Sequence, residues 1–397
     1  MTLNDAFYTY IQQYKDADVN TLRLQQKKAQ DFDVSFAIDQ IEARKKIKNK
    51  LPGWAQHPCL LFPSVLSAEQ ASSEETAAYK AALLPDGVTL CDLTGGLGVD
   101  TYYFSRKASS VTYIERNALY CDVARHNYAR LDRPNITVIH ADCVGFARQN
   151  NGQFDVCYID PARRGENNKR VFAFEDCEPD ILSLLPDLFR FTRRVMVKAS
   201  PMVDIVLAQK QLPGLAEIHV VSVRNECKEL LFVLQKELPE TATPQTICVN
   251  LLSGEQETFT FSARQEQALS RPAFAASLST YLYEPNASIL KAGAFKAVAA
   301  AYNIGKLHIN SHLYTSDQYI SRFPGRKFQI LESGDFSAKT MKAMAGKYPK
   351  AAISARNFPL RPEEIRKRWK IKEGDEFFLL ATTLYPDKKI VIAARKA

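Results

Sequence analysis

Five short apolar runs recur at similar intervals between residues 88 and 200, and segments that suit helices separate them. The runs are VTLCDL at 88–93, VTYIE at 111–115, ITVIH at 136–140, FDVCYID at 154–160 and VMVKAS at 195–200. Strands that alternate with helices pair in parallel and carry helices on both faces of the sheet. This alternation therefore predicts an open, doubly wound α/β sheet.

Two more strand-like runs, 217–226 and 228–236, follow with almost no residues between them. Because so short a connection cannot cross over a sheet, these strands must pair as an antiparallel hairpin. Together with the five parallel strands, they predict a Rossmann-like sheet of seven strands with one reversed edge strand.

Four parts are predicted for the 397 residues. Residues 1–78 show helical spacing of apolar residues, 79–240 carry the sheet, 241–322 hold a connecting hairpin and a small α/β region, and 323–397 follow as a separate basic α/β domain. We expect the order β-α-β-α-β-β in the last part.

Two local patterns give sharper expectations. Ser72 stands three residues before Glu75, which predicts a capping box at the start of a helix. The alternating segment 306–314 predicts a strand that would place His308 and His312 on one face without a third metal ligand.

The formal net charge of +8 is concentrated at the carboxyl-terminal end. Residues 325–397 carry 17 Lys and Arg against 8 Asp and Glu, a net of +9, which leaves −1 for the first 324 residues. An excess this localised is typical of proteins that bind phosphate backbones. Arg366, Lys367 and Arg368 lie on one predicted helix and are the expected contacts, with a solvated helix face as the alternative.

Membrane proteins and metal-thiolate proteins do not fit this sequence. No apolar run reaches the roughly 18 residues of a membrane span, and the start lacks the pattern of a signal peptide, so we expect a cytoplasmic protein without membrane contact. The two closest cysteines, Cys143 and Cys157, are 14 residues apart, so there is no C-x-x-C pair and we expect no bound metal.

The stretch CDLTGGLGVD at 91–100 follows the first strand. Gly95, Gly96 and Gly98 allow a tight turn that exposes backbone N–H groups where a helix begins. A dinucleotide site would need G-x-G-x-x-G and a P-loop would need G-x-x-x-x-G-K-[ST], and the stretch matches neither.

Acids follow four successive strands, namely Asp92, Glu115, Asp142 and Asp160. Ligands of open α/β sheets bind at this edge, and an acid about 20 residues after the glycine turn meets ribose hydroxyls there. Each acid alone could simply cap the next helix. Four together, without a pyrophosphate motif, indicate S-adenosylmethionine, which carries an ammonium group, a ribose and an adenine.

With these motifs the chain resembles the class I S-adenosylmethionine-dependent methyltransferases. More closely, it resembles the bacterial methyltransferase-type proteins with a C-terminal THUMP-like domain, through QASSEETAAYKA at 70–81, DLTGGLGVD at 92–100, YIDPARRG at 158–165 and the basic end. The resemblance implies a class I methyltransferase sheet, an N-terminal helical region, and small ferredoxin-like and THUMP-like α/β domains. The THUMP association implies RNA, particularly tRNA, as the partner.

The resemblance also implies which residues bind the cofactor. They are Asp92, Thr94, Gly95, Gly96, Gly98, Glu115, Asp142 and Cys143. Glu115 would hold the ribose, and Asp142 with Cys143 would border the adenine.

The stretch YIDPARRG looks like the D/N-P-P-x motif of methyltransferases that act on nucleobase nitrogens. Asp160 would accept a hydrogen bond from an exocyclic amine, and Pro161 would fix the turn. Ala162 replaces the second proline of that motif, and Arg163 replaces its stacking aromatic. Arg163 or Arg164 would meet a guanine edge or a phosphate, and ion pairs with nearby acids are the alternative.

A stacking partner for the base would then come from Phe172, Phe174 or Tyr158. The fifth strand is followed by Ser200 in place of the thiol that C5 methylation of uridine requires, which favours N-methylation.

The leading hypothesis is an enzyme that N-methylates a nucleobase of structured RNA, tRNA before rRNA. A methyltransferase for a protein or a small molecule is the second. A non-catalytic RNA-binding protein that keeps the fold as a scaffold is the third.

Overall fold

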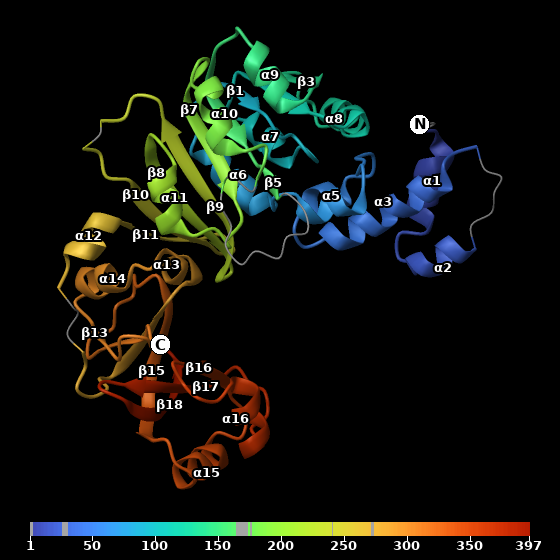
Figure 1. Ribbon diagram of the computed structural model, residues 1–397. Coiled ribbons are helices and arrows are strands. Elements are labelled where there is room, and N and C mark those ends of the chain that lie inside the picture. The colour runs from blue at the N-terminus through green and yellow to red at the C-terminus, as the bar shows by residue number, and fades with distance from the viewer. Residues whose placement is uncertain (1–2, 26–30, 164–173, 175–176, 240, 271–273) are drawn as a thin grey trace. The chain divides into compact units, whose positions relative to one another are not determined.

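The computed structural model describes residues 3–25, 31–163, 174, 177–239, 241–270 and 274–397 (Figure 1). The chain divides into two compact units. The first comprises Met1–Ala216 and Leu231–Glu240, and the second comprises Glu217–Leu230 and Thr241–Ala397.

Helices precede the first strand, as the spacing of apolar residues predicts. They are α1 (Asp5–Gln13), α2 (Val19–Leu24), α3 (Val34–Ile47), α4 (Pro52–Gln56), α5 (Val65–Gln70) and α6 (Glu74–Ala82). The predicted capping box of Ser72 and Glu75 is wrong, because Ser73 is the N-cap of α6 and accepts from the Thr76 N–H at 3.1 Å. Ser72 is buried and donates instead to Asp100 at 2.7 Å.

The seven strands predicted for the central sheet are present. They are β1 (Thr89–Asp92), β2 (Ser110–Glu115), β3 (Ile136–His140), β4 (Phe154–Ile159), β7 (Thr192–Ala199), β8 (Leu215–Val223) and β9 (Glu226–Gln235). β1 pairs in parallel with β2 and β4, β2 with β3, and β4 with β7. The predicted doubly wound α/β sheet is therefore confirmed.

The sheet continues beyond these strands, in the order β11-β10-β8-β9-β7-β4-β1-β2-β3. The reversed strand was predicted at the edge of the sheet, and this is wrong, because β9 returns between β7 and β8. The free edge of β8 then pairs with β10 (Gln245–Leu251), and β11 (Gln256–Ser262) pairs with β10. Positive φ angles at Arg224 and Asn225 give the two-residue hairpin turn between β8 and β9.

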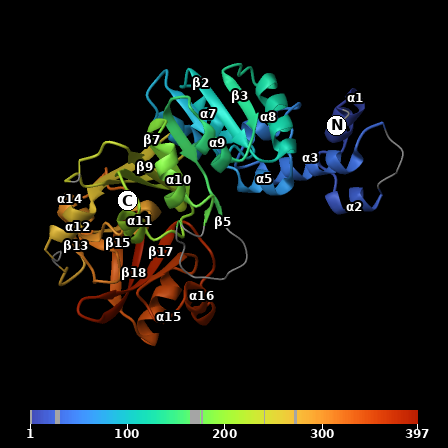
Figure 2. The ribbon, with the colours of Figure 1, turned by 45° about the horizontal axis from the view of Figure 1, so that its top comes forward.

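Helices cover this sheet on both faces (Figure 2). They include α7 (Val99–Phe104), α8 (Ala118–Arg130), α9 (Cys143–Gln149), α10 (Ile181–Leu188) and α11 (Ile205–Gln211). Leu90, Val111 and Val156 share one buried cluster with Phe104 of α7 and Ala77 of α6. This packing and the strand pairing hold β1, β2 and β4 side by side. The short strands β5 (Ala162–Arg163) and β6 (Cys177–Glu178) pair next to them.

A second sheet has seven strands in the order β13-β14-β12-β15-β18-β17-β16. Its elements, with α12 (Ala263–Ala268), are β12 (Tyr281–Pro285), α13 (Ala287–Ala292), α14 (Phe295–Tyr302), β13 (Gly305–Lys306), β14 (Tyr314–Ser316), β15 (Gly325–Asp335), α15 (Ala338–Lys347), β16 (Ala352–Arg356), α16 (Pro362–Trp369), β17 (Phe377–Leu384) and β18 (Lys388–Lys396). The order β-α-β-α-β-β predicted after residue 325 is present. Because β15 pairs with both β12 and β18, this segment does not form a sheet of its own.

The strand predicted over 306–314 is wrong. β13 ends at Lys306, and the chain turns through His308 and His312 before β14. His312 has a φ of 51°, which a strand does not accommodate. The two histidines therefore do not share a strand face.

Candidate functional site

The glycine turn after β1 is as tight as the sequence predicts, because two tyrosines lie against it. A Cβ on Gly95 would lie 2.0 Å from the Tyr113 ring. Gly98 has a φ of 86°, and a Cβ there would lie 2.1 Å from the Tyr128 hydroxyl. Both tyrosines also donate to backbone carbonyls of the turn, at 2.7 and 3.1 Å. Glycine is therefore required at both positions.

Asp92 anchors this turn from inside the protein. Its Oδ1 accepts from the Thr94 N–H at 3.1 Å, and its Oδ2 accepts from the Thr101 hydroxyl at 2.6 Å. The residue is 1% exposed, and burial raises its pKa to about 7, although both hydrogen bonds lower it. We infer that Asp92 mainly holds the turn in shape.

Glu115 ends β2 and reaches back to the same turn. Its Oε2 accepts from the Gly96 N–H at 3.0 Å, and its Oε1 accepts from the Asn117 N–H at 2.8 Å. Each carboxylate oxygen keeps a further lone pair. The pair of oxygens is thus fixed in position and able to accept from two neighbouring hydroxyls.

Asp142 and Cys143 form the start of α9. Asp142 is the N-cap, and its Oδ2 accepts from the Gly145 N–H at 2.8 Å. Burial, then the charge of Asp142, raises the pKa of Cys143 to about 11, so its thiol stays protonated at neutral pH. The capping role considered from the sequence is therefore present.

Asp160 is held from two sides at the end of β4. Its backbone N–H donates to the Thr94 hydroxyl at 2.7 Å, and its Oδ2 lies 2.5 Å from Nζ of Lys198. The Asp160 side chain is 35% exposed and that of Lys198 is 13% exposed. Sequence reasoning missed Lys198, whose only signal was a lone cation near the end of the apolar run VMVKAS.

A second group missed from the sequence surrounds Asp100, the second residue of α7. The buried Lys80 lies 3.1 Å from its Oδ1, while Ser72 and Tyr158 donate to its Oδ2 at 2.7 and 2.8 Å. Burial raises the pKa of Asp100, but the charge of Lys80 and these hydrogen bonds outweigh it and hold the pKa below its usual value. Asp100 is therefore an ionised carboxylate.

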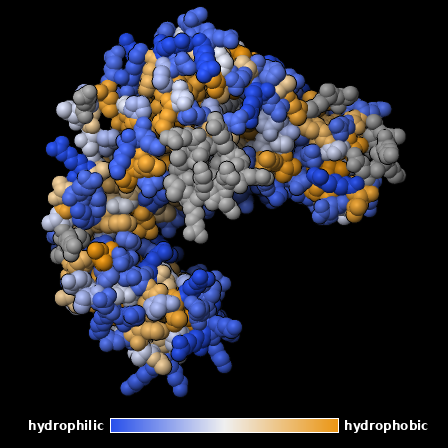
Figure 3. Space-filling view, viewed as in Figure 1, coloured by the Kyte–Doolittle hydropathy of each residue, from blue (hydrophilic) through white to orange (hydrophobic). Residues whose placement is uncertain are grey.

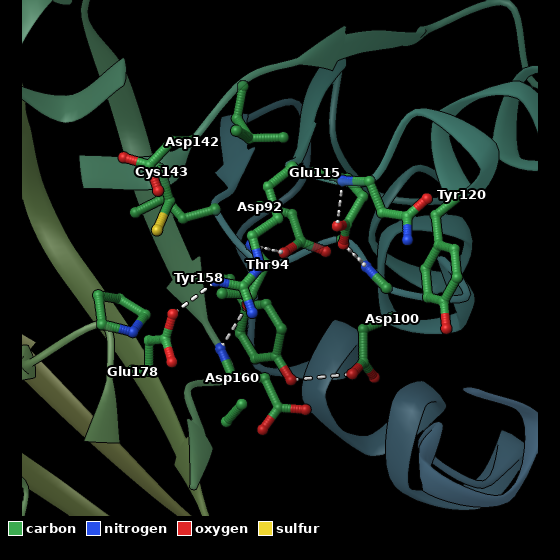
Figure 4. Close-up of a pocket in the computed structure, with 18 of the residues that line it drawn as sticks. Asp92, Thr94, Asp100, Glu115, Tyr120, Asp142, Cys143, Tyr158, Asp160 and Glu178 are labelled. Atoms are coloured by element: carbon green, nitrogen blue, oxygen red, sulfur yellow. Dashed lines mark hydrogen bonds and ion pairs between the residues drawn. The ribbon is translucent and has the colours of Figure 1, made fainter. Parts of the chain in front are cut away.

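The glycine turn and the acids at the strand ends line one cavity of about 710 Å³ at the carboxyl ends of β1, β2 and β4 (Figure 4). The predicted residues on its wall are Asp92, Thr94, Gly95, Gly96, Gly98, Glu115, Asp142, Cys143 and Asp160. Asp100, Ser72 and Glu178 also line it. The structure thus brings the predicted cofactor residues and Asp160 together at one site.

The remaining predicted residues are not among those found on the cavity wall. Pro161 follows Asp160 but is not on the cavity wall, and Arg163 belongs to β5. Arg164 lies outside the described residues. The other three, Arg366, Lys367 and Arg368, lie on α16 of the second unit.

Two of the three candidate stacking residues are wrong. Tyr158 and Phe174 are both 1% exposed; Tyr158 donates to Asp100, and Phe174 packs against Phe232 with ring centroids 5.4 Å apart. The third, Phe172, lies outside the described residues. A buried ring has no free face, so neither Tyr158 nor Phe174 can stack on a base.

Within the described residues, no group of three or more His, Cys, Asp or Glu side chains is arranged to hold a metal ion. No helix in the same part of the chain is long and apolar enough to cross a membrane.

Comparison with known families identifies the carboxyl-terminal segments. Residues 281–324 match a family described as a ferredoxin-like domain, and residues 325–396 match one described as THUMP domain-like. The two small folds expected from the sequence are thereby confirmed.

Two of the known proteins that match this chain cover very different shares of it. A crystal structure described as "putative methyltransferase from Porphyromonas gingivalis W83" has 36% sequence identity and a TM-score of 0.88, with 100% of both chains covered. A Mycoplasma mobile protein described as an uncharacterized RNA methyltransferase is 38% identical over 74 residues, which are 19% of this chain. That match spans 20% of the Mycoplasma protein, about one fifth of its length.

Proposed function

We propose, from the premise that this chain belongs to the methyltransferase family of the Porphyromonas gingivalis protein, that it N-methylates a nucleobase of structured RNA. We favour tRNA over rRNA as that RNA. Its cofactor is S-adenosylmethionine. When bound, this cofactor supplies a methyl group on a cationic sulfonium, which suits a cavity walled by carboxylates.

The residues of the cavity divide the work of holding the cofactor. Glu115 would accept from the ribose hydroxyls, since both of its oxygens are fixed by backbone N–H groups. Asp142 and Cys143 would border the adenine. The ionised Asp100 on the same wall would face the ammonium group, while Asp92 keeps the glycine turn in place. Charge-assisted hydrogen bonds of this kind contribute about 1.5–3 kcal/mol each.

The observation that carries the reaction type is the placement of the Asp160 carboxylate. It lies at the cavity, follows a strand directly, and is held by Lys198 and Thr94. A carboxylate fixed in this way can accept from the N–H of a base and aim the nitrogen lone pair at the methyl group. Methyl transfer depends mainly on such positioning of the two reactants.

Three features support RNA as the substrate. Residues 325–396 match a THUMP domain-like family, residues 325–397 carry a net charge of +9, and the Mycoplasma mobile relative is described as an RNA methyltransferase. Arg164, which lies outside the described residues, and Arg366, Lys367 and Arg368 on α16 remain the proposed contacts from the sequence.

The test is transfer of labelled methyl from S-adenosylmethionine to tRNA and rRNA from cells that lack this protein. We expect label in one RNA fraction, abolished by Asp160→Ala while cofactor affinity stays within about threefold. Asp122→Ala is the control, because Asp122 is an exposed acid of the same unit that pairs with Arg125.

Three other results would replace the proposal. Label in protein or in small molecules would move the substrate to that class. Absence of both transfer and cofactor binding would leave an RNA-binding scaffold. Equal loss of cofactor binding in Asp160→Ala would make Asp160 a cofactor residue.

A further inference from the structure

A buried carboxylate holds two arginines together in the second unit. Glu284 of β12 is 2% exposed. Its Oε2 forms an ion pair with Nη2 of Arg326, and its Oε1 accepts from Nε of Arg356 at 2.8 Å. Since both guanidinium groups contact one carboxylate, they lie next to each other.

The fold builds this cluster from three strands. Arg326 is the register partner of Glu284 across β12 and β15. Gly325 permits that approach, because a Cβ there would lie 2.2 Å from the Glu284 carbonyl oxygen at a φ of 146°. Arg356 ends β16, where Asn357 turns the chain with a φ of 51°. The cluster thus joins residues of the ferredoxin-like segment and of the THUMP domain-like segment.

Most hydrogen-bond donors of the two arginines remain unused. A guanidinium has five N–H donors. Within the described residues, the Arg356 side chain donates only through Nε, and that of Arg326 forms one ion pair, with Glu284, and lies over the Phe328 ring. Their side chains are 45% and 41% exposed. The free donors therefore face solvent, on a cluster whose net charge is +1.

The charge of the cluster does not depend on a histidine beside it. Burial, then the charges of Lys306 and Arg356, lowers the pKa of His312 to about 4. His312 is therefore neutral at physiological pH, and the positive charge comes from the arginines.

The surface over α15 and α16 of the same unit is largely hydrophilic (Figure 3).

We propose that Arg326 and Arg356, oriented by Glu284, form a binding site for a phosphate group of the RNA backbone. Planar guanidinium groups bind phosphate oxygens in pairs, and a fixed guanidinium loses less entropy on binding than a free one. Both arginines belong to the segment that carries the net charge of +9. The inference rests on the RNA substrate proposed above and assigns contacts different from the α16 cations.

The first test measures binding of total tRNA to the full chain between about 50 and 300 mM salt. Arg326→Gln and Arg356→Gln should each reduce the slope of log K against log salt by about 0.7–0.9, the value for one phosphate contact. Each single variant leaves Glu284 one ion-pair partner. Arg395→Gln is the matched control, since Arg395 is an exposed arginine of the same sheet that donates to Gln329. An equal slope change in Arg395→Gln, or no change in the other two, would overturn the site.

Glu284→Gln separates orientation from charge. This variant raises the net charge by one, so binding by charge alone would become tighter. We expect at least threefold weaker binding, in protein whose cooperative thermal unfolding shows that it is folded. If the variant does not fold, the two arginine variants decide alone. Tighter binding would overturn the role of Glu284.

Two further experiments distinguish RNA phosphate from a free anion, and failure of this site from failure of the proposed reaction. Calorimetry with inorganic phosphate tests a free anion: submillimolar binding that needs both arginines, with unchanged RNA slopes, would overturn the RNA assignment. Cofactor binding and methyl transfer are measured on the same variants. Retained cofactor binding with weakened RNA binding supports the site, whereas loss of transfer in Asp160→Ala concerns only the proposed reaction.

Discussion

Replacing Lys198 with methionine should slow methyl transfer about tenfold while leaving cofactor affinity within about threefold. The change removes the ammonium group that lies 2.5 Å from the Asp160 carboxylate and keeps the length of the side chain. A charge-assisted hydrogen bond is worth about 1.5–3 kcal/mol. Because Asp160 is 35% exposed, solvent screens the pair and the lower end applies. About 1.4 kcal/mol corresponds to a factor of ten in rate.

The assay is single-turnover transfer of labelled methyl to the RNA substrate, with the cofactor dissociation constant measured by calorimetry. Lys198→Arg should recover most of the rate, since it retains a cation within reach of Asp160. Lys107→Met is the matched control, because Lys107 pairs at 3.1 Å with Asp86, which, unlike Asp160, does not line the cavity. Wild-type transfer by Lys198→Met, or an arginine variant as slow as the methionine variant, would refute the positioning role.

Three other predictions concern stability. Burial raises the pKa of Asp92 to about 7, so the stability that the protonated carboxyl contributes is present at pH 4 and is lost as pH rises through 7. Relative to Asp92→Asn, the wild-type free energy of unfolding should fall by up to about 1.4 kcal/mol per pH unit over that range. Urea-unfolding free energies of the two proteins that change in parallel with pH would contradict this. Gly98→Ala should cost about 2–4 kcal/mol in urea unfolding, with part recovered when Tyr128→Phe removes the clashing hydroxyl; an unchanged midpoint would show that the turn relaxes. Lys80→Met should cost about 3–5 kcal/mol by leaving Asp100 buried without its cation, and adding Asp100→Asn should restore thermal stability; no recovery would mean that Lys80 acts through packing.

The order of helices and strands was predictable because local patterns determine it. Alternation of short apolar runs identified β1 to β4 and β7, and the near absence of residues between two runs identified the β8–β9 hairpin. The position of β9 inside the sheet was not predictable, since strand order depends on which free edge each strand meets. The turn through His308 and His312 was also missed, because an alternating pattern does not report a positive φ angle.

The cofactor side of the site was predictable from one rule. Acids at successive ends of parallel strands must converge, and Asp92, Glu115, Asp142 and Asp160 do line one cavity. Their division of labour was not predictable. Asp92 turned out to bond to Thr94 and Thr101, because the packed sheet buries it.

The amino-acid sequence by itself determined the repeating strand and helix pattern, the glycine turn and the acids at the strand ends, since each of these depends on neighbouring residues. Only the tertiary structure decided which charges meet. Lys198 pairs with Asp160 across 38 residues, and Arg356 pairs with Glu284 across 72. Such pairs form where packing removes water from side chains on different strands, and that depends on register and burial, which no local pattern encodes.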